Sequence, residues 1–184
     1  YQRLNRFEKA LEWLQEYEPQ CAAYVKRDRD EQRVEDFLAL KHFAHGCERV
    51  YSRDRWLLTG EAGVFTDPFY SPGSDFIGMS NTFITDIITR ERRGEDVGDR
   101  LGRHNTLYLP LFVAFLLVYT NQYPIMGNGQ VMTLKAAWDN GSYWAVPALL
   151  FFQKRLVDPA FMASVETLMK RYFVLHARMQ QLLH

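Results

Sequence analysis

The sequence is short of cysteine, of net charge and of long apolar runs, and each shortage removes a class of protein. Its two cysteines, Cys21 and Cys47, are too few for a disulfide framework. Basic and acidic residues are equal in number, 22 of each, so no net field attracts nucleic acid or an anionic membrane. The apolar run from Leu107 to Tyr119 is shorter than the ~20 residues of a membrane-spanning helix, and it contains Pro110. We therefore expect a globular protein without a nucleic-acid partner, and a peripheral membrane role remains the minority alternative.

The amino-terminal end has no basic-then-apolar leader, and the first methionine is Met79. Together with the low cysteine content, the missing leader favours a cytoplasmic location. The late methionine suggests a piece of a longer protein. No internal repeat and no low-complexity tract is visible.

What is present is enough apolar material for one sizeable core: 47% of the residues are hydrophobic and 15% are aromatic. Helical spacing predicts an amphipathic helix over residues 6–17, with Asn5 as its N-cap. The charged residues 21–36 are interpreted as a solvated helix or connector. Residues 37–59 alternate enough to predict two short strands joined by a charged turn, the second being a buried strand over Trp56–Thr59.

The remaining sequence predicts helices. One begins between Gly73 and Phe76, is capped by Ser74 or Asp75, and ends at Gly94. The run Leu107–Tyr119 predicts a buried core helix, and residues 131–156 predict another with a break at Asn140 and Gly141.

A tail helix is predicted from Pro159, with Asp158 as its cap. Its apolar stripe, expected to face inward, consists of Phe161, Leu168, Leu175 and Leu182. The fold class is thus mainly α with a small β portion: a strand-turn-helix segment followed by an all-helical carboxyl region. We divide the chain into a domain of residues 1–94 and a helical region of residues 95–184.

The segment between the predicted strand and helix, "GEAGVFTDPFYSPG", is rich in glycine and proline. Gly60 lets the backbone pass close to a ligand, Glu61 can accept hydrogen bonds from hydroxyls, and Ala62 leaves room, a combination that suits a polyol. The turn at Ser71–Gly73 leads into a helix start, where free N–H groups and the positive dipole end favour an electron-rich oxygen or an anion.

These residues carry a family resemblance. The stretch "WLLTGEAGVFTDPFYSPGSDF" resembles the second flavin fingerprint of FAD-dependent aromatic hydroxylases and flavin-dependent halogenases. The resemblance implies FAD as cofactor, with the acid near the ribityl chain and the loop and helix start along the flavin ring. It also implies an oxidoreductase that hydroxylates an electron-rich ring or oxidises halide, with a small aromatic molecule as possible substrate. The residues that would contact FAD are Gly60, Glu61, Ala62, Asp67, Pro68, Ser71, Pro72, Gly73 and Ser74.

The sequence departs from the family at several points. Glu61 is one methylene longer than the usual Asp, and Pro72 has no N–H to offer a halide. Neither the Gly-x-Gly-x-x-Gly fingerprint nor the Trp-x-Trp-x-Ile-Pro signature of halogenases is present, so no catalytic residue can be named. We interpret the chain as the carboxyl part of a larger FAD/NAD(P)-binding fold whose dinucleotide half lies upstream. By itself the chain is then expected neither to retain FAD nor to be active.

The sequence also admits other interpretations. A helical interaction or scaffold module without cofactor is the main alternative. His42, His45 and Cys47 could suggest a metal, but no fourth ligand has suitable spacing, so no metal is expected. His104, His176 and His184 are interpreted as surface or satisfied histidines. Core packing is favoured over a substrate pocket for the aromatic residues of the helical half, which are Tyr108, Phe112, Phe115, Trp138, Tyr143, Trp144, Phe151 and Phe152.

Overall fold

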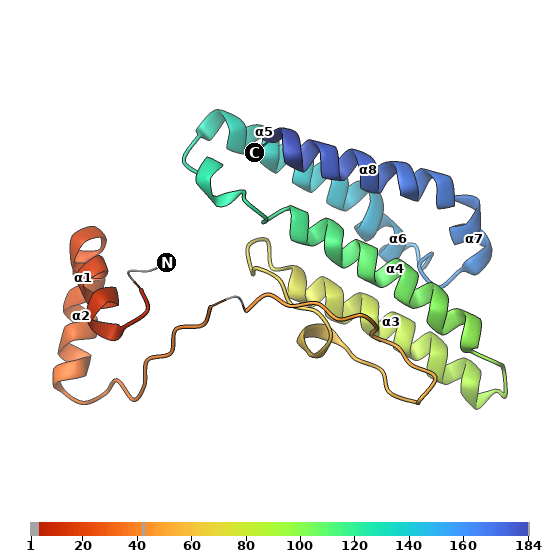
Figure 1. Ribbon diagram of the computed structural model, residues 1–184, viewed down its shortest axis with the longest axis horizontal. Coiled ribbons are helices and arrows are strands. Elements are labelled where there is room, and N and C mark those ends of the chain that lie inside the picture. Colours follow the sequence, from red (N-terminus) through yellow and green to blue (C-terminus); the bar gives the residue numbers. More distant parts are fainter. Residues whose placement is uncertain (1–3, 42, 184) are drawn as a thin grey trace. The chain divides into compact units, whose positions relative to one another are not determined.

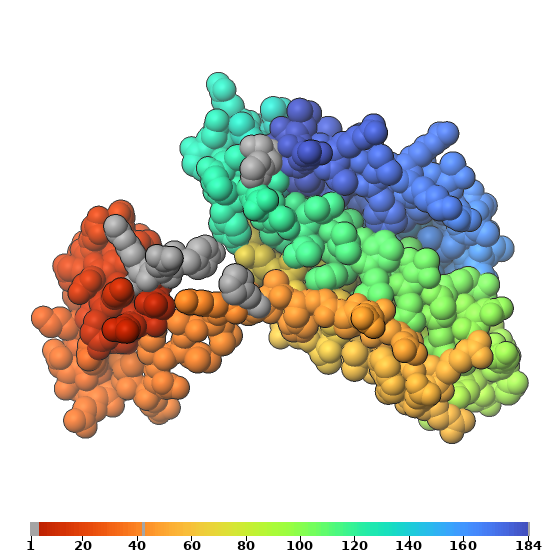
Figure 2. Space-filling model, viewed as in Figure 1, coloured from red at the N-terminus to blue at the C-terminus, as the bar shows by residue number. Residues whose placement is uncertain are grey.

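The computed structural model describes residues 4–41 and 43–183 (Figures 1 and 2). His42 and His184 therefore lie outside the described residues. The chain forms two compact units, Tyr1–Phe43 and Ala44–His184, which are described separately. The boundary predicted at residue 94 concerned a flavin-binding part and a helical part, and it stays a prediction.

The first unit is a helical hairpin. Helix α1 (Phe7–Tyr17) packs against α2 (Pro19–Asp30), and an ion pair of 3.0 Å joins Glu8 to Arg29. The predicted helix over residues 6–17 is confirmed, but its predicted cap is wrong, because Arg6 holds the N-cap position and no side chain caps the helix. None of the residues of α1 is buried.

Residues 44–71 contain no strand in the structure, so the predicted strand over Trp56–Thr59 is wrong. The pairing is limited to two isolated antiparallel bridges, Tyr51 with Leu57 and His45 with Phe65. The segment packs on a helix and not on a third strand: the Leu58 carbonyl accepts a hydrogen bond of 2.9 Å from the Ser80 hydroxyl of α3. The expected strand-turn-helix is thus an extended segment, a 3-10 turn η1 (Gly60–Ala62) and a helix.

The second unit is a bundle, and the structure as a whole is mostly helical. Its longer helices are α3 (Pro72–Arg92), α4 (Gly98–Leu117), α5 (Gly129–Tyr143) and α8 (Glu166–Leu183). The shorter elements are η2 (Tyr123–Ile125), η3 (Trp144–Ala148), α6 (Leu149–Phe152) and α7 (Pro159–Ser164). Helix α4 is central, since it packs against both α3 and α8 (Figure 1).

The core lies between α3 and α4 and is largely aromatic. Tyr108 of α4 packs edge-on against Phe83 and Phe76 of α3, and Tyr51 of the extended segment joins them. All four rings are at most 2% exposed. The run Leu107–Tyr119 is therefore largely part of a core helix, as predicted. Across residues 4–41 and 43–183, no helix is both long and apolar enough to cross a membrane.

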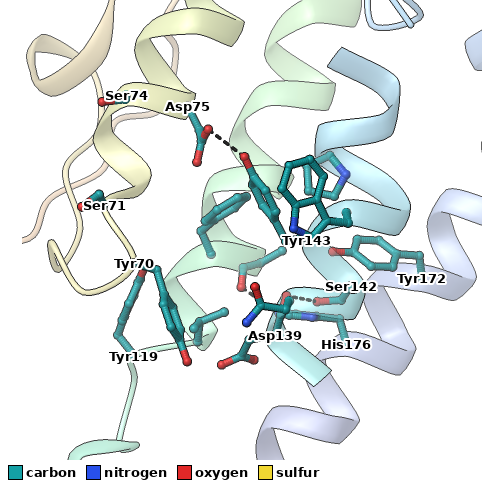
Figure 3. Close-up of a pocket in the computed structure, with 16 residues that line it drawn as sticks. Tyr70, Ser71, Ser74, Asp75, Tyr119, Asp139, Ser142, Tyr143, Tyr172 and His176 are labelled. Carbon is teal, nitrogen blue, oxygen red and sulfur yellow. Dashed lines mark hydrogen bonds between the residues drawn. The ribbon is translucent and has the colours of Figure 1, made fainter. Parts of the chain in front are cut away.

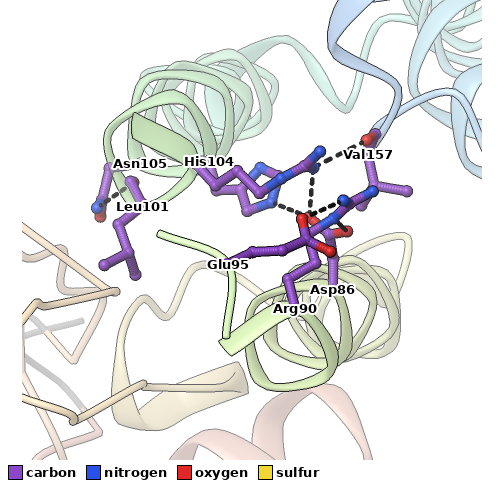
Figure 4. A network of polar contacts seen from close by, with 8 residues as sticks. Asp86, Arg90, Glu95, Leu101, His104, Asn105 and Val157 are labelled. Carbon is purple, nitrogen blue, oxygen red and sulfur yellow. Dashed lines mark hydrogen bonds and ion pairs between the residues drawn. The ribbon is translucent and has the colours of Figure 1, made fainter. Parts of the chain in front are cut away.

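A polar cluster ties the carboxyl-terminal part of α3 to α4 (Figure 4). Asp86 accepts hydrogen bonds of 2.8 Å from Arg90, 2.8 Å from Arg100 and 3.0 Å from His104. Burial lowers the pKa of His104 despite the Asp86 carboxylate, so the imidazole is neutral and donates its Nε2–H. Gly94, which has a φ of 80°, follows the last turn of α3 as predicted.

Two details of the helical half correct the sequence prediction. Helix α5 runs through Asn140 and Gly141 without a break. The irregularity is the single π-turn η3, where Pro147 has no N–H to donate to the regular helical ladder.

The tail helix begins at Pro159, and the Asp158 side chain caps it by accepting from the Phe161 N–H at 3.0 Å. The predicted inward stripe is wrong for three of its four residues: Leu168 is 65%, Leu175 51% and Leu182 77% exposed, whereas Phe161 packs against the core. The chain turns at Val165 between α7 and α8, which rotates the buried face by about one residue. The face that is buried instead carries Met169, His176 and Gln180.

Candidate functional site

The amino end of α3 begins in an unusual way. Ser71 occupies the N-cap position with φ 55° and ψ 46°, in the left-handed region, and its side chain makes no capping hydrogen bond. Pro72 follows at the first helical position and is buried. The predicted caps Ser74 and Asp75 are therefore wrong: the fixed φ of Pro72 suits the first turn, and its missing N–H needs no acceptor there.

Gly73 and Ser74 present unpaired N–H groups at this end. No carbonyl or side chain among the described residues accepts a hydrogen bond from either one. A Cβ placed on Gly73 would meet nothing within 4 Å. The first turn of α3 thus offers two donors, the positive end of the helix dipole, and empty space beside the backbone.

The loop before α3 is held from outside by two tyrosines. Asp67 accepts a hydrogen bond of 2.9 Å from the Phe69 N–H and another from the Tyr123 hydroxyl. The Tyr119 hydroxyl donates to the Phe69 carbonyl, and the Ser71 N–H donates to the Pro68 carbonyl at 2.7 Å. Asp67 and Pro68 therefore shape the loop that leads to the helix start.

The first part of the predicted motif has a structural explanation of its own. Gly60 has φ 53°, and a Cβ there would lie 2.8 Å from Ile77 of α3. A Cβ on Gly63 would lie 2.9 Å from Val50. Glu61 and Ala62 are exposed, and the Glu61 carbonyl accepts from the His45 ring at 3.0 Å. The glycines at 60 and 63 are thus required by packing, whereas Gly73 is not.

A cavity of about 410 Å³ opens beside the start of α3 (Figure 3). Ser71 and Ser74 line it, so the structure brings these two predicted residues to a pocket. Helices α4, α5 and α8 and the π-turn η3 supply most of the other walls. Six of the lining side chains are aromatic: Tyr70, Phe115, Tyr119, Tyr143, Trp144 and Tyr172. The aromatic residues of the helical half thus divide between core and cavity, because Tyr108 and Phe112 are buried in the core.

One side of the cavity rests on a buried polar network. Lys135 is fully buried, and its Nζ lies 2.9 Å from Asp139 and 2.9 Å from Gln180. Gln180 in turn donates to Asp139 at 2.6 Å. The carboxylate of Asp139 thus has a counter-ion and a further donor, which is what a buried charge requires.

His176 also lines the cavity, and burial lowers its pKa. Its Nε2–H donates to the Ala114 carbonyl at 3.0 Å, so the ring is neutral with a defined tautomer. Neither His176 nor Asp139 was predicted as a cavity residue. For Asp139, the sequence offered one signal: Lys135 and Asp139 are spaced i, i+4, as in a helical ion pair. The structure shows that α5 buries both side chains.

Asp75 is the second carboxylate of the cavity. It points from α3 toward Tyr143, whose hydroxyl donates to it at 3.0 Å (Figure 3). Burial raises the pKa of Asp75, and the Tyr143 hydrogen bond offsets this only in part. Unlike Asp139, it has no cationic partner among the described residues.

The described ranges 4–41 and 43–183 contain no group of three metal-ligating side chains close enough to hold an ion. His42, one of the candidates considered from the sequence, lies outside them.

Comparison with known proteins points to one class, the flavin-dependent halogenases. A stretch of 161 residues, 86% of this chain, is 20% identical to the flavin-dependent halogenase chlA of Dictyostelium discoideum. The chain spans only about a quarter (26%) of that protein. No family model and no solved structure matches the chain. This distant similarity supports at most a flavin oxidoreductase-like origin.

Proposed function

We propose that this chain is the flavin-contacting carboxyl part of an FAD-dependent oxidoreductase of the halogenase or aromatic-hydroxylase type. The observation that carries the proposal is the start of α3, where Gly73 and Ser74 present unpaired N–H groups and Gly73 leaves room for a closely approaching group. These features fit the electron-rich pyrimidine edge of a flavin, which needs hydrogen-bond donors and close backbone approach.

The other motif residues take supporting roles in this proposal. Glu61 is exposed on η1 and available to the ribityl hydroxyls. Asp67, Pro68 and Ser71 fix the loop, and Pro72 sets the direction of the helix start. Gly60 and Ala62 complete the turn that carries Glu61. The flavin would supply the redox chemistry, and the residues of this chain would orient the ring and exclude water.

The pyrophosphate of FAD has no anchor in this proposal other than an upstream dinucleotide-binding half. Without it, a few polyol and ring contacts must offset an association cost of ~4 to 15 kcal/mol. We therefore expect the 184 residues alone to bind FAD at best very weakly. The alternative of a scaffold module without cofactor is not favoured, because it leaves the similarity to a flavoprotein without a reason.

The decisive experiment measures flavin binding by the longer protein that contains this sequence. Gly73→Val should weaken FAD binding at least tenfold, because a branched side chain fills the space that the ring needs. Gly102→Val is the matched control, since Gly102 also lies in a helix with nothing within 4 Å of its Cβ position. Glu61→Asp should have little effect.

Two results would contradict the proposal. One is equal FAD affinity for Gly73→Val and the native protein, measured by flavin fluorescence titration. The other is tight retention of FAD by the 184-residue chain alone, visible as a flavin absorbance band after gel filtration.

A further inference from the structure

The cavity beside α3 has an electrostatic character that the flavin proposal does not use. Of the described residues that line it, the only ones with ionisable carboxyl groups are Asp75 and Asp139, and none is a lysine or an arginine. Its only histidine, His176, is held neutral by burial. A ligand carboxylate or phosphate entering this cavity would therefore find no counter-charge on its walls.

The two acids differ in what compensates them. Asp139 is already neutralised by Lys135, which lies behind it at 2.9 Å. Asp75 has only the hydroxyl of Tyr143 at 3.0 Å. It lies in the first turn of α3, where the helix dipole favours the ionised form, while burial disfavours it. Asp75 is thus a partly desolvated carboxylate that lacks a cation.

The walls around Asp75 suit a cation as well. Tyr143 and Trp144 are adjacent and pack edge to face, with ring centroids 5.3 Å apart, and Phe115 packs edge-on against Tyr143. Faces of Trp, Tyr and Phe attract ammonium groups within about 6 Å of the ring centroid. The cavity volume of about 410 Å³ falls within the ~300 to 1,000 Å³ of small-molecule sites.

We propose that this cavity binds an organic amine with an aromatic body, its protonated nitrogen on Asp75 and its ring among Tyr143, Trp144 and Phe115. The ammonium supplies the counter-charge that Asp75 lacks, and the ring fills the apolar part of the cavity. The two proposals share Ser71 and Ser74, which line the cavity, but they use different groups: the amine would use the Asp75 side chain, which points toward Tyr143, whereas the flavin would use the backbone N–H groups of Gly73 and Ser74.

Three probes that share one ring test the charge preference. Tyramine carries an ammonium, 4-ethylphenol is neutral, and 3-(4-hydroxyphenyl)propionate carries a carboxylate at pH 7. Isothermal titration of the full 184-residue chain should show tyramine binding at least tenfold more tightly than 4-ethylphenol, with the propionate weakest. If 4-ethylphenol or the propionate binds as tightly as tyramine, or if tyramine does not bind at millimolar concentration, the proposal is wrong.

A pair of variants tests whether the preference for the ammonium group depends on Asp75. Asp75→Asn keeps an acceptor for Tyr143 but removes the charge, so it should reduce tyramine affinity at least tenfold and leave 4-ethylphenol unchanged. Asp99→Asn is the matched control, because Asp99 is an exposed acid in the first turn of α4. Equal tyramine affinity for Asp75→Asn and the native chain overturns the assignment. Far-ultraviolet circular dichroism verifies that both variants are folded.

The same variant separates this proposal from the flavin proposal. In the longer protein, Asp75→Asn should leave FAD affinity unchanged, while Gly73→Val should weaken it. Asp75-dependent tyramine binding in a protein that does not bind FAD would support the amine site and refute only the flavin proposal.

Discussion

The two ends of α3 differ in how their polar groups are paired. At its carboxyl-terminal part, Asp86 accepts hydrogen bonds from Arg90, Arg100 and His104 (Figure 4). At its amino end, Gly73 and Ser74 have free N–H groups, and Asp75 has no cation. Because most polar groups of a folded protein are paired, we regard the first end as the anchor and the second as the candidate site.

The largest expected effect is at the anchor. Asp86→Ala removes the carboxylate that accepts from Arg100 and His104, whose side chains are 13% and 5% exposed, and leaves Arg100 with only the Val157 carbonyl at 3.4 Å. Breaking a buried pair on one side costs about 3 to 5 kcal/mol, so the free energy of unfolding should fall by about that amount. Urea denaturation measures it. A loss below about 1 kcal/mol would show that Asp86 is not the anchor.

Gly60→Val should be the next most damaging change. Its Cβ would lie 2.8 Å from Ile77, and φ 53° is strained for a branched residue. We expect a loss of about 2 to 4 kcal/mol. A native-like denaturation midpoint for this variant would show that η1 can move away from α3, and the packing explanation of Gly60 would then be wrong.

Asp67→Ala tests how the loop is held in front of the site. The substitution removes the acceptor for the Phe69 N–H and for the Tyr123 hydroxyl, so we expect a loss of about 1 to 2 kcal/mol. Tyr123→Phe removes only one of the two bonds and should cost less. If Tyr123→Phe lowers the free energy of unfolding as much as Asp67→Ala does, the hydrogen bond from the Phe69 N–H to Asp67 contributes nothing to stability.

The two aspartates of α3 should affect acid stability in opposite directions. Hydrogen bonds from Arg90, His104 and Arg100 outweigh burial and lower the pKa of Asp86, so its stabilisation is present above the unfolded pKa of ~3.9 and is lost as pH falls. Burial raises the pKa of Asp75, so its stabilisation is present below ~3.9 and is lost as pH rises. Asp86→Asn should therefore lower the free energy of unfolding relative to the native chain, and this loss should shrink as the pH falls from 5 to 3. Asp75→Asn should cause no loss in the free energy of unfolding at pH 7. A deficit of Asp86→Asn that is constant over this range would contradict the assignment.

The smallest expected change in stability is at the site itself. Gly73→Ala places a methyl group in open space in a helical turn, and it should raise the free energy of unfolding by about 0.4 to 1 kcal/mol. Thermal unfolding of the chain measures this. A loss above 1 kcal/mol would mean that Gly73 has a structural reason after all.

The fold was predictable from the sequence where single residues start or end a helix. Asp158 with Pro159 starts the tail helix, and Gly94 follows the end of α3, because their preferences are local. The inward face of α8 was not predictable: His176 and Gln180 are polar, yet they are buried because partners on α4 and α5 accept their hydrogen bonds. Those partners are distant in sequence, so the apolar stripe pointed to the wrong face.

The candidate site was predictable only in part, for the same reason. Ser71 and Ser74 were found from the motif, and both line the cavity. Asp75 is adjacent to them, but its role depends on Tyr143, 68 residues away. The strand expected before the loop was also wrong, because the Leu58 carbonyl is taken by a helix side chain and not by a neighbouring strand.

The unpaired amides at the start of α3 have a consequence for hydrogen exchange. An amide proton without an acceptor exchanges rapidly with solvent deuterium, whereas those farther along α3 are protected by the helical ladder. Pro72 has no amide proton, so any slowing in this turn on adding a ligand is reported first by Gly73 and Ser74. The exchange rates of these two amides therefore report whether the site is occupied: exchange is fast when no ligand is bound and slows when an electron-rich atom accepts their hydrogen bonds.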